Sequence, residues 1–253
     1  MKITVNPQYN IFADFVRAIP ATFARAGKQI YQSRNIIKIF DVNAVRLCVK
    51  SYREPIFINR LIYTFWRPSK ANRAYFNALK VLARGFETPA PVAYIEEKRG
   101  GLLSKSYFIS LECPYSTDLR HFERNHAYSD EDREILRLVG KLNAQLHERE
   151  VLHLDFSPGN ILYQNIDGNY HFSLLDINRM DFCKVGLKEG CRNFQRLRGS
   201  EEMFEIMAQA YAEERGFDAK LCKKLIVKYN AEHVIYLEKR RKWKQRWKNL
   251  RKK

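Results

Sequence analysis

The segment "VLHLDFSPGNILY", residues 151–163, places a His, an Asp, a Pro-Gly turn and an Asn directly before an apolar run. Pro158-Gly159 is a turn signal, and the apolar "NILY" that follows predicts the short strand that this turn feeds. The polar residues His153, Asp155 and Asn160 are therefore crowded onto one loop between two apolar segments. Because rigid scaffolds commonly present reactive side chains from loops, this loop is the first candidate for a reaction centre.

The residues that precede this loop predict a small, mainly β lobe over about residues 20–111. A short helical pattern around residues 11–23 comes first, followed by the β-type runs "KQIYQ", "NIIKIF" and "AVRLCVKSY". The segment "PSKANRAYFNALKVLARG" predicts the main helix, with Ser69 as N-cap, Tyr75, Leu79 and Leu82 as its apolar stripe, and Gly85 beyond its end. The runs "TPAPVAYIEE" and "KSYFISLE" predict two further strands.

The pattern becomes mainly helical from about residue 116. Ser129 to Asp132 form a capping-box start, and an apolar stripe at helical spacing follows it, formed by Ile135, Leu138, Val139, Leu142 and Leu146. Two strands around the turn Asp167-Gly168 follow the loop, and everything from Leu187 onward is expected to be helical. The segment "LECPYS" between the two regions is the expected hinge.

The order of these elements resembles the protein-kinase-like fold over about residues 25–180. His153-Leu154-Asp155 with Asn160 stands where kinases carry their catalytic loop, Asp176-Ile177-Asn178 stands where they carry D-F-G, and Lys50 in "LCVK" matches their small-lobe lysine. The resemblance implies an α+β, two-lobed molecule. Residues 1–113 would form a nucleotide-covering lobe, residues 114–237 a helical lobe with the catalytic loop and metal site, and residues 238–253 a basic tail.

Within that fold the chain is similar to the lipopolysaccharide kinases, the Kdo and heptose kinase group. The segments "HLDFSPGNIL", "LLDINRM" and "SKANRAYFNALKVLARGFETPAPVAY" carry this likeness. It implies an ATP- and Mg²⁺-dependent phosphotransferase that acts on a sugar hydroxyl of the lipopolysaccharide inner core. The acceptor would be a core sugar linked to lipid A at the cytoplasmic face of the membrane.

Each candidate residue has a physical reason to be in such a site. Phosphoryl transfer needs an aligned hydroxyl and cations that neutralise phosphate charge. Asp155 would accept or orient the hydroxyl proton, while Asn160 and Asp176 offer the hard oxygen ligands that Mg²⁺ prefers. Lys50 would hold the α- and β-phosphates as a point charge. His153 is expected to brace the loop.

Three departures from the kinase pattern affect these expectations. The helix position that normally pairs with the lysine is Ala74, and no acidic residue lies between Glu54 and Glu87. Either Lys50 pairs with another carboxylate, for which Asp176 is the candidate, or the site is less well organised. The segment "FARAGKQIYQ" has a single glycine to cover phosphate, Gly27. Ser157 in the loop and the absence of A-P-E after Asp176 argue against a protein substrate.

The charge of the chain is concentrated at its C-terminal end. The net charge is +17, and the last sixteen residues, "EKRRKWKQRWKNLRKK", contain ten basic residues and one acidic residue. Tyr236, Trp243, Trp247 and Leu250 recur at helical spacing among these charges, which is typical of an interfacial helix on an anionic membrane. The alternative is a helix whose tryptophans pack on the large lobe. Nucleic-acid binding is unlikely because the charge is terminal.

The remaining composition predicts a cytoplasmic protein, with peripheral membrane binding as an option. There is no 18-residue apolar run and no apolar signal segment, and the five cysteines form no C-x-x-C pair and are expected to be buried free thiols. Two rival functions stay open. One is a kinase-like binding module with little or no catalysis, and the other is a kinase-like enzyme acting on another small hydroxyl compound or on protein.

Overall fold

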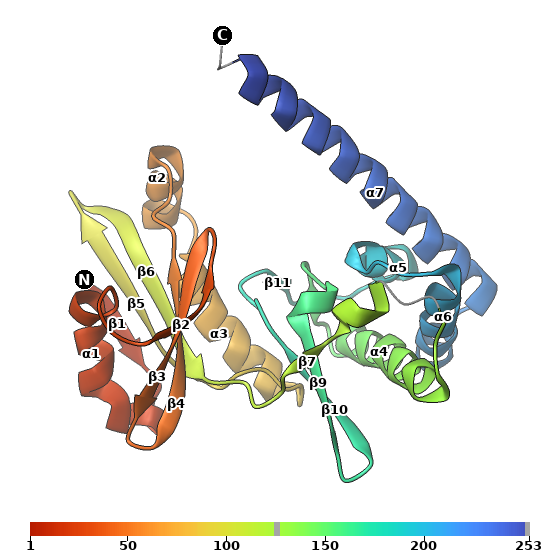
Figure 1. Ribbon diagram of the computed structural model, residues 1–253, viewed down its shortest axis with the longest axis horizontal. Helices are drawn as coiled ribbons and strands as arrows, with labels where there is room; N and C mark the ends of the chain where they lie inside the picture. Colours follow the sequence, from red (N-terminus) through yellow and green to blue (C-terminus); the bar gives the residue numbers. More distant parts are fainter. Residues whose placement is uncertain (124–126, 251–253) are drawn as a thin grey trace. The chain divides into compact units, whose positions relative to one another are not determined.

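The structure, a computed structural model, describes residues 1–123 and 127–250 (Figure 1). Its contacts divide the chain into two compact units. The first contains Met1–Ser116 and the returning segment Ser173–Arg179, and the second contains Thr117–Phe172 and the residues from Met180 onward. The chain leaves the first unit after Ser116 and comes back to it for one short segment, which the sequence did not indicate.

The first unit is built on one antiparallel sheet of six strands in the order β1-β5-β6-β4-β3-β2. The strands are β1 (Lys2–Val5), β2 (Lys28–Gln32), β3 (Asn35–Val42), β4 (Val45–Tyr52), β5 (Pro91–Arg99) and β6 (Leu102–Leu111), and the helices are α1 (Ala13–Thr22), α2 (Phe57–Phe65) and α3 (Lys70–Ala83), with a 3-10 turn at Pro7–Phe12. The predicted strands and main helix are therefore present. The edge strand β1 and the helix α2 were not predicted.

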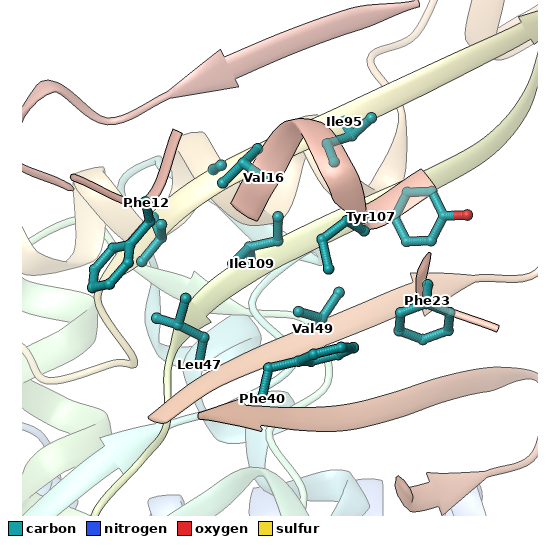
Figure 2. Packing of buried hydrophobic residues seen from close by; sticks show 12 residues of the cluster. Phe12, Val16, Phe23, Phe40, Leu47, Val49, Ile95, Tyr107 and Ile109 are labelled. Carbon is teal, nitrogen blue, oxygen red and sulfur yellow. The ribbon is translucent and has the colours of Figure 1, made fainter. Parts of the chain in front are cut away.

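Alternation along β4 assigns the two faces of this sheet. Leu47 and Val49 point to the face that α1 covers and belong to a buried apolar cluster with Phe12, Val16, Phe23, Phe40, Ile95, Tyr107 and Ile109 (Figure 2). Successive strand residues point to opposite faces, so the side chains of Lys50 and Tyr52 point to the other face of the sheet. Tyr52 packs with Ala74 and Tyr75 of α3. The strand register therefore directs Lys50 to the face that carries α3.

Gly27 has a packing role at the turn before β2. Its φ is +81°, and a Cβ placed there would lie 2.5 Å from the ring of Phe40. Only glycine adopts this conformation at no steric cost, and only glycine lets the backbone come this close to the ring. Lys38, on the α1 side of the sheet, donates to the carbonyls of Phe23 and Ala26 at 2.7 and 2.9 Å, so its ammonium closes the C-terminal end of the helix.

The second unit is mainly helical. It contains β7 (Thr117–Asp118), α4 (Asp130–Glu148), β8 (Leu152–His153), β9 (Ile161–Ile166), β10 (Asn169–Leu174), β11 (Met180–Asp181), α5 (Leu187–Asn193), α6 (Glu201–Arg215) and α7 (Ala219–Leu250), with 3-10 turns at Leu119–Glu123, Pro158–Asn160 and Phe194–Arg196. Strands β10, β9 and β7 form one small sheet, and β11 pairs with β8. The last two residues of β10 belong to the first unit.

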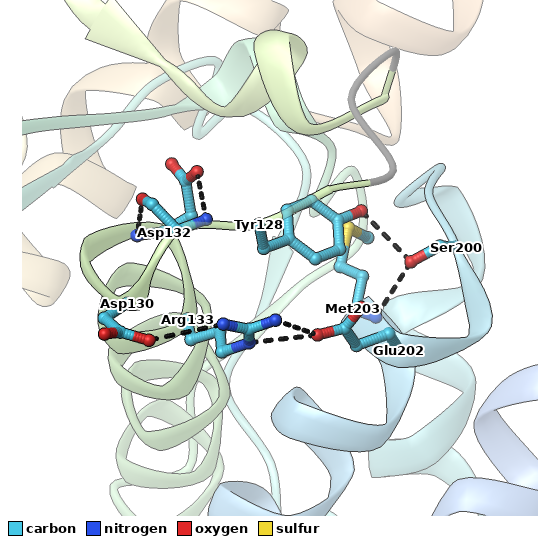
Figure 3. Close-up of polar contacts among 8 residues, drawn as sticks. Tyr128, Asp130, Asp132, Arg133, Ser200, Glu202 and Met203 are labelled. Atoms are coloured by element: carbon cyan, nitrogen blue, oxygen red, sulfur yellow. Dashed lines mark hydrogen bonds and ion pairs between the residues drawn. The ribbon is translucent and has the colours of Figure 1, made fainter.

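Helices α4 and α6 pack closely along their length. A Cβ on Gly140 would lie 2.5 Å from the carbonyl oxygen of Met207, so glycine sets the approach of the two helices. The predicted capping box of Ser129 and Asp132 is present at the start of α4. Arg133 binds Glu202 at the edge of the contact (Figure 3).

The buried face of α4 differs from the predicted stripe. Ile135, Val139 and Leu146 are buried as expected, but Leu138 and Leu142 are only half-buried. The other buried residues are Leu136, Gly140, Asn143, Ala144 and His147, so the face includes small and polar residues that an apolar pattern does not count.

Helix α7 continues without a break through residue 238, so the basic residues extend a helix that begins at Ala219. Tyr236, Trp243 and Trp247 are exposed, whereas the side chain of Leu250 lies outside the described residues. No helix among the described residues is long and apolar enough to cross a membrane. The five cysteines are free thiols, but only Cys191 and Cys222 are buried, and Cys183 is exposed.

Candidate active site

Lys50 and Asp176 form an ion pair within the first unit. The Nζ of Lys50 lies 2.6 Å from Oδ1 of Asp176, and 16% and 32% of the two side chains are exposed. The Nδ2 of Asn178 donates to the same oxygen at 2.5 Å. Lys50 thus binds the alternative carboxylate that the sequence pointed to. Its partner comes from 126 positions further along the chain.

The segment around Asp176 is held in place by residues that follow or lie on α3. Asn77 donates from Nδ2 to the carbonyl of Ile177 at 2.7 Å, and Thr88 donates from its hydroxyl to the carbonyl of Leu174 at 2.7 Å. Asp176 itself has φ +51°, in the left-handed region that costs non-glycine residues free energy. The surrounding hydrogen bonds therefore hold the carboxylate in a conformation that an unconstrained chain would rarely adopt.

A group of cations surrounds this ion pair on the α3 side. The pKa of Lys70 is lowered by burial and by the neighbouring charges of Arg179 and Arg73, and the negative charge of Asp176 offsets part of this shift. Burial and nearby guanidinium groups lower the pKa of Arg73 as well. The mutual repulsion of these cations makes the region a favourable place for an anion.

Ala74 does not supply a carboxylate to this group. It is buried, with 2% of its surface exposed, against the aromatic residues Tyr52 and Tyr75. Burial raises the pKa of Tyr52 well above its usual range, and the charge of Asp176 adds to the shift. Lys50 lies 5.4 Å above the Tyr52 ring. Ala74 is thus part of an apolar cluster, and the acidic partner of Lys50 is Asp176.

In the second unit, Asp155 and Asn160 share one tightly hydrogen-bonded loop. The backbone N–H of Asp155 donates to Nδ1 of His153 at 3.1 Å, and Nδ2 of Asn160 donates to the carbonyl of Asp155 at 2.9 Å. The bond from Asn160 uses the amide nitrogen, which leaves Oδ1 as the polar atom able to bind a cation. The expected bracing role of His153 matches this geometry.

A buried polar network supports the same loop from behind. Asn193 of α5 donates from Nδ2 to the carbonyl of His153 at 2.8 Å. Its Oδ1 lies 3.2 Å from Nε2 of His147, whose Nδ1 lies 3.0 Å from the hydroxyl of Tyr211. Burial lowers the pKa of His147 to about 3, so the ring is neutral and its two nitrogens act as one donor and one acceptor. Residues of α4, α5 and α6 thereby fix the position of the loop.

Cations also gather around Asp155. Nη1 of Arg196 lies 3.1 Å from Oδ1 of Asp155, and 34% and 20% of the two side chains are exposed. The pKa of His233 on α7 is lowered by burial and by Arg196 and Arg198, whereas Asp155 opposes the shift. These residues were not singled out from the sequence, because no local pattern connects "QRLRGS", about 40 residues after the loop, or α7, which lies further along the chain, with Asp155.

The four predicted site residues thus form two pairs. Lys50 and Asp176 meet in the first unit, and Asp155 and Asn160 lie together in the second. Among the described residues, no group of three or more His, Cys, Asp or Glu side chains is placed to hold a metal ion. A carboxylate and an amide oxygen are nevertheless the donor types that suit Mg²⁺, which commonly takes its other ligands from water and phosphate.

Comparison with known proteins shows what this chain is similar to. The family model described as "Lipopolysaccharide kinase (Kdo/WaaP) family" matches residues 32–229. A 3-deoxy-D-manno-octulosonic acid kinase from Actinobacillus succinogenes is 29% identical over 184 residues, which is 69% of this chain and 72% of that protein. One from Vibrio cholerae is 24% identical over 159 residues, or 61% of this chain and 64% of that protein.

A solved structure supports the fold. The structure titled "WaaP in complex with acyl carrier protein" superposes with a TM-score of 0.62 and covers 95% of this chain and 98% of that one, at 14% sequence identity. This likeness confirms the expected α+β, protein-kinase-like fold. Since the family model spans both units and includes Lys50, Asp155, Asn160 and Asp176, the chain belongs to the lipopolysaccharide kinase (Kdo/WaaP) family.

Proposed function

We propose that this protein is an ATP- and Mg²⁺-dependent kinase that phosphorylates a hydroxyl of Kdo, 3-deoxy-D-manno-octulosonic acid, in the lipopolysaccharide inner core. Membership of the family supports lipopolysaccharide as substrate, and the similarity to two 3-deoxy-D-manno-octulosonic acid kinases favours Kdo over heptose. The observation that carries the proposal is the Lys50–Asp176 ion pair, because it pairs the two residues expected to bind phosphate and metal.

We assign the nucleotide side of the site to residues of the first unit. Lys50 would bind the α- and β-phosphates, with Lys70 and Arg73 adding positive charge. Asp176 and Asn160 would hold Mg²⁺, and both offer hard oxygen ligands. When bound, the ion neutralises phosphate charge as the γ-phosphoryl group is transferred. The hydrogen bonds from Asn178 and Asn77 keep the Asp176 segment in place for this role.

Asp155 is proposed as the residue that receives or orients the proton of the attacking sugar hydroxyl. Its backbone is fixed by His153 and by Asn160. Arg196 binds its carboxylate and would act as a positioning residue. The side chain of Asp155 is 20% exposed and is backed by a buried network, which suits a group that must meet an incoming hydroxyl at a set position.

The experiment compares three variants in two assays. Thermal shift with Mg-ATP measures nucleotide binding, and turnover with Kdo-bearing lipid A measures transfer. Asp176→Asn should abolish both the stabilisation and the turnover, whereas Asp155→Asn should keep the stabilisation and lower turnover by about 10²–10⁴-fold. Asp167→Asn, in the β9–β10 turn, is the matched control and should behave like the parent. Two results would contradict the proposed substrate. One is turnover on an acceptor that offers only heptose hydroxyls equal to the turnover on Kdo, and the other is no turnover on Kdo.

The rival function as a binding module keeps one observation in its favour, which is the burial of Ala74 at the position where kinases carry a glutamate. It predicts nucleotide-induced stabilisation without transfer to any acceptor. Stabilisation of the parent together with absent turnover on core sugars, free sugars and a generic protein would favour that function. Turnover on a free sugar or on protein alone would instead favour the other kinase-like enzyme.

We further propose that the enzyme acts at the cytoplasmic face of the membrane, where the basic part of α7 attracts anionic lipid. The exposure of Trp243 and Trp247 supports this over the packing alternative. Their rings lie 5.5 Å apart on one side of the helix. Removing residues 239–253 should weaken sedimentation with anionic vesicles.

A further inference from the structure

Helix α2 is attached to the first unit through its polar side chains. Arg60 donates from Nε to the carbonyl of Leu103 at 2.9 Å and from Nη2 to the carbonyl of Arg99 at 3.0 Å. The N–H of Leu103 donates to the hydroxyl of Thr64 at 2.9 Å. The helix is therefore held against the β5–β6 hairpin by hydrogen bonds. Helices of globular domains usually attach through an apolar stripe and expose their polar side.

The apolar side of α2 faces outward. None of the residues of this helix, all of which the structure describes, is buried. Phe65 is 65% exposed and Trp66 is 77% exposed, and the remaining large exposed apolar residues of the segment are Ile56, Phe57, Ile58 and Ile62. Ile58, Ile62 and Phe65 are spaced by four and three residues, so they line one side. These six large apolar side chains, four on α2 and one at each end of it, form a patch that soluble surfaces rarely present without a partner.

Positive charge lies beside the C-terminal end of this patch, at Arg67. Between Glu54 and Glu87 the sequence contains six basic residues and no acidic one. Arg67 follows the helix directly and is exposed, and it is close enough to Arg73 to lower the pKa of that guanidinium further. The apolar patch and the cations thus occur on the same part of the first unit. An occupant that combines an apolar phase with anionic groups matches both.

We propose that α2 docks on an anionic lipid bilayer, with Phe57, Ile58, Phe65 and Trp66 entering the interfacial region and Arg67 binding lipid phosphate. An aromatic residue next to an arginine at a helix end is typical of membrane interfaces. A second copy of the chain fits less well, because a two-fold contact through this helix would bring two basic clusters together. The membrane is also where a lipid-linked acceptor lies, but the proposal does not depend on catalysis.

The position of the three tryptophans allows a direct test, since Trp66 adjoins α2 and the other two lie on α7. A Trp243→Phe/Trp247→Phe protein reports on Trp66 alone, and a Trp66→Phe protein reports on the tail alone. Vesicles of phosphatidylglycerol and phosphatidylcholine serve as the probe, with pure phosphatidylcholine as the uncharged control. We expect the fluorescence of Trp66 to shift to the blue and to become protected from acrylamide only with the anionic vesicles.

A second variant measures the contribution of the patch. Ile58→Gln/Phe65→Gln/Trp66→Gln changes exposed side chains, so its thermal unfolding should match that of the parent, while its vesicle partition coefficient should fall by about tenfold or more. Trp243→Gln/Trp247→Gln is the matched control on α7, and its partition coefficient should fall by less than that of the triple variant. Unchanged partitioning of the triple variant, or an unshifted Trp66, overturns the proposal. The proposal is also overturned if the parent is a dimer in the absence of lipid and the triple variant is a monomer, since the occupant of the patch would then be a second copy of the chain.

The result can be separated from that of the proposed function. The vesicles carry no acceptor sugar, and the residues changed on α2 take no part in the nucleotide or acceptor sites. If the kinase assignment fails but α2 binds vesicles, the docking surface stands. If the triple variant binds vesicles like the parent while phosphorylating Kdo, only the docking surface is refuted.

Discussion

His147 should make the stability of the second unit depend on pH. Its ring is buried, hydrogen-bonded to Tyr211 and Asn193, and neutral because burial lowers its pKa to about 3. In the unfolded chain the same ring returns to a pKa of 6.5. Between these two values the unfolded state binds the proton and the folded state does not, so stability is fully present above the unfolded pKa and falls as the pH is lowered through that window.

The size of the effect follows from the two protonation states. Between pH 7 and pH 5 the folded ring stays neutral while the unfolded ring becomes almost fully protonated, which removes about 2 kcal/mol from the free energy of unfolding. His147→Gln keeps polar atoms at the site but cannot titrate. At neutral pH it should cost about 1–3 kcal/mol through weakened hydrogen bonds to its two partners. On acidification, however, it should lose about 2 kcal/mol less than the parent.

Urea unfolding at pH 7 and pH 5, monitored by far-ultraviolet circular dichroism, measures how much stability the parent and His147→Gln each lose on acidification. His121→Gln replaces an exposed histidine and is the matched control. It should retain the parent's loss of stability on acidification. If the parent and His147→Gln lose equal stability between the two pH values, the argument that a buried neutral histidine supports the loop of Asp155 and Asn160 is wrong.

Two further predictions concern packing and the Asp176 segment. Gly140→Ala should lower the free energy of unfolding by about 1–3 kcal/mol, because its Cβ would meet the Met207 backbone at 2.5 Å, and Gly186→Ala, which has open space around it, should have little effect in the same urea assay. Asn77→Leu removes the hydrogen bond to the Ile177 carbonyl and should weaken Mg-ATP binding by about tenfold, measured by calorimetry. Equal affinity in that variant and the parent would mean that the Asp176 segment holds its position without Asn77.

Local signals in the sequence predicted the elements that carry the site. The strand containing Lys50, the Ser69 N-cap and the capping box at Ser129 are all present, because each depends on residues within a few positions of one another. The pairing of Lys50 with Asp176 could also be predicted from the sequence. It followed from the absence of any acidic residue on the helix where a partner is normally found.

Other features depend on contacts between distant residues or break the usual pattern. Arg196 and His233 reach Asp155 only through the packing of α7 against the 3-10 turn that contains Arg196, and no local pattern reports this. His147 and Asn193 are polar residues 46 positions apart, and their burial depends on mutual hydrogen bonds. Helix α2 was not predicted, although Ile58, Ile62 and Phe65 recur at helical spacing. A sequence pattern does not report that this apolar side faces outward.

The return of residues 173–179 to the first unit has a consequence for dissecting the protein. A single cleavage after Ser116 would separate Lys50 from its carboxylate partner and leave Glu87 and Thr88 without the strand end that they bind. A fragment that ends at Ser116 is therefore expected to reproduce the first unit poorly. Joining residues 173–179 to it through a flexible linker would restore a contiguous piece with both charged groups.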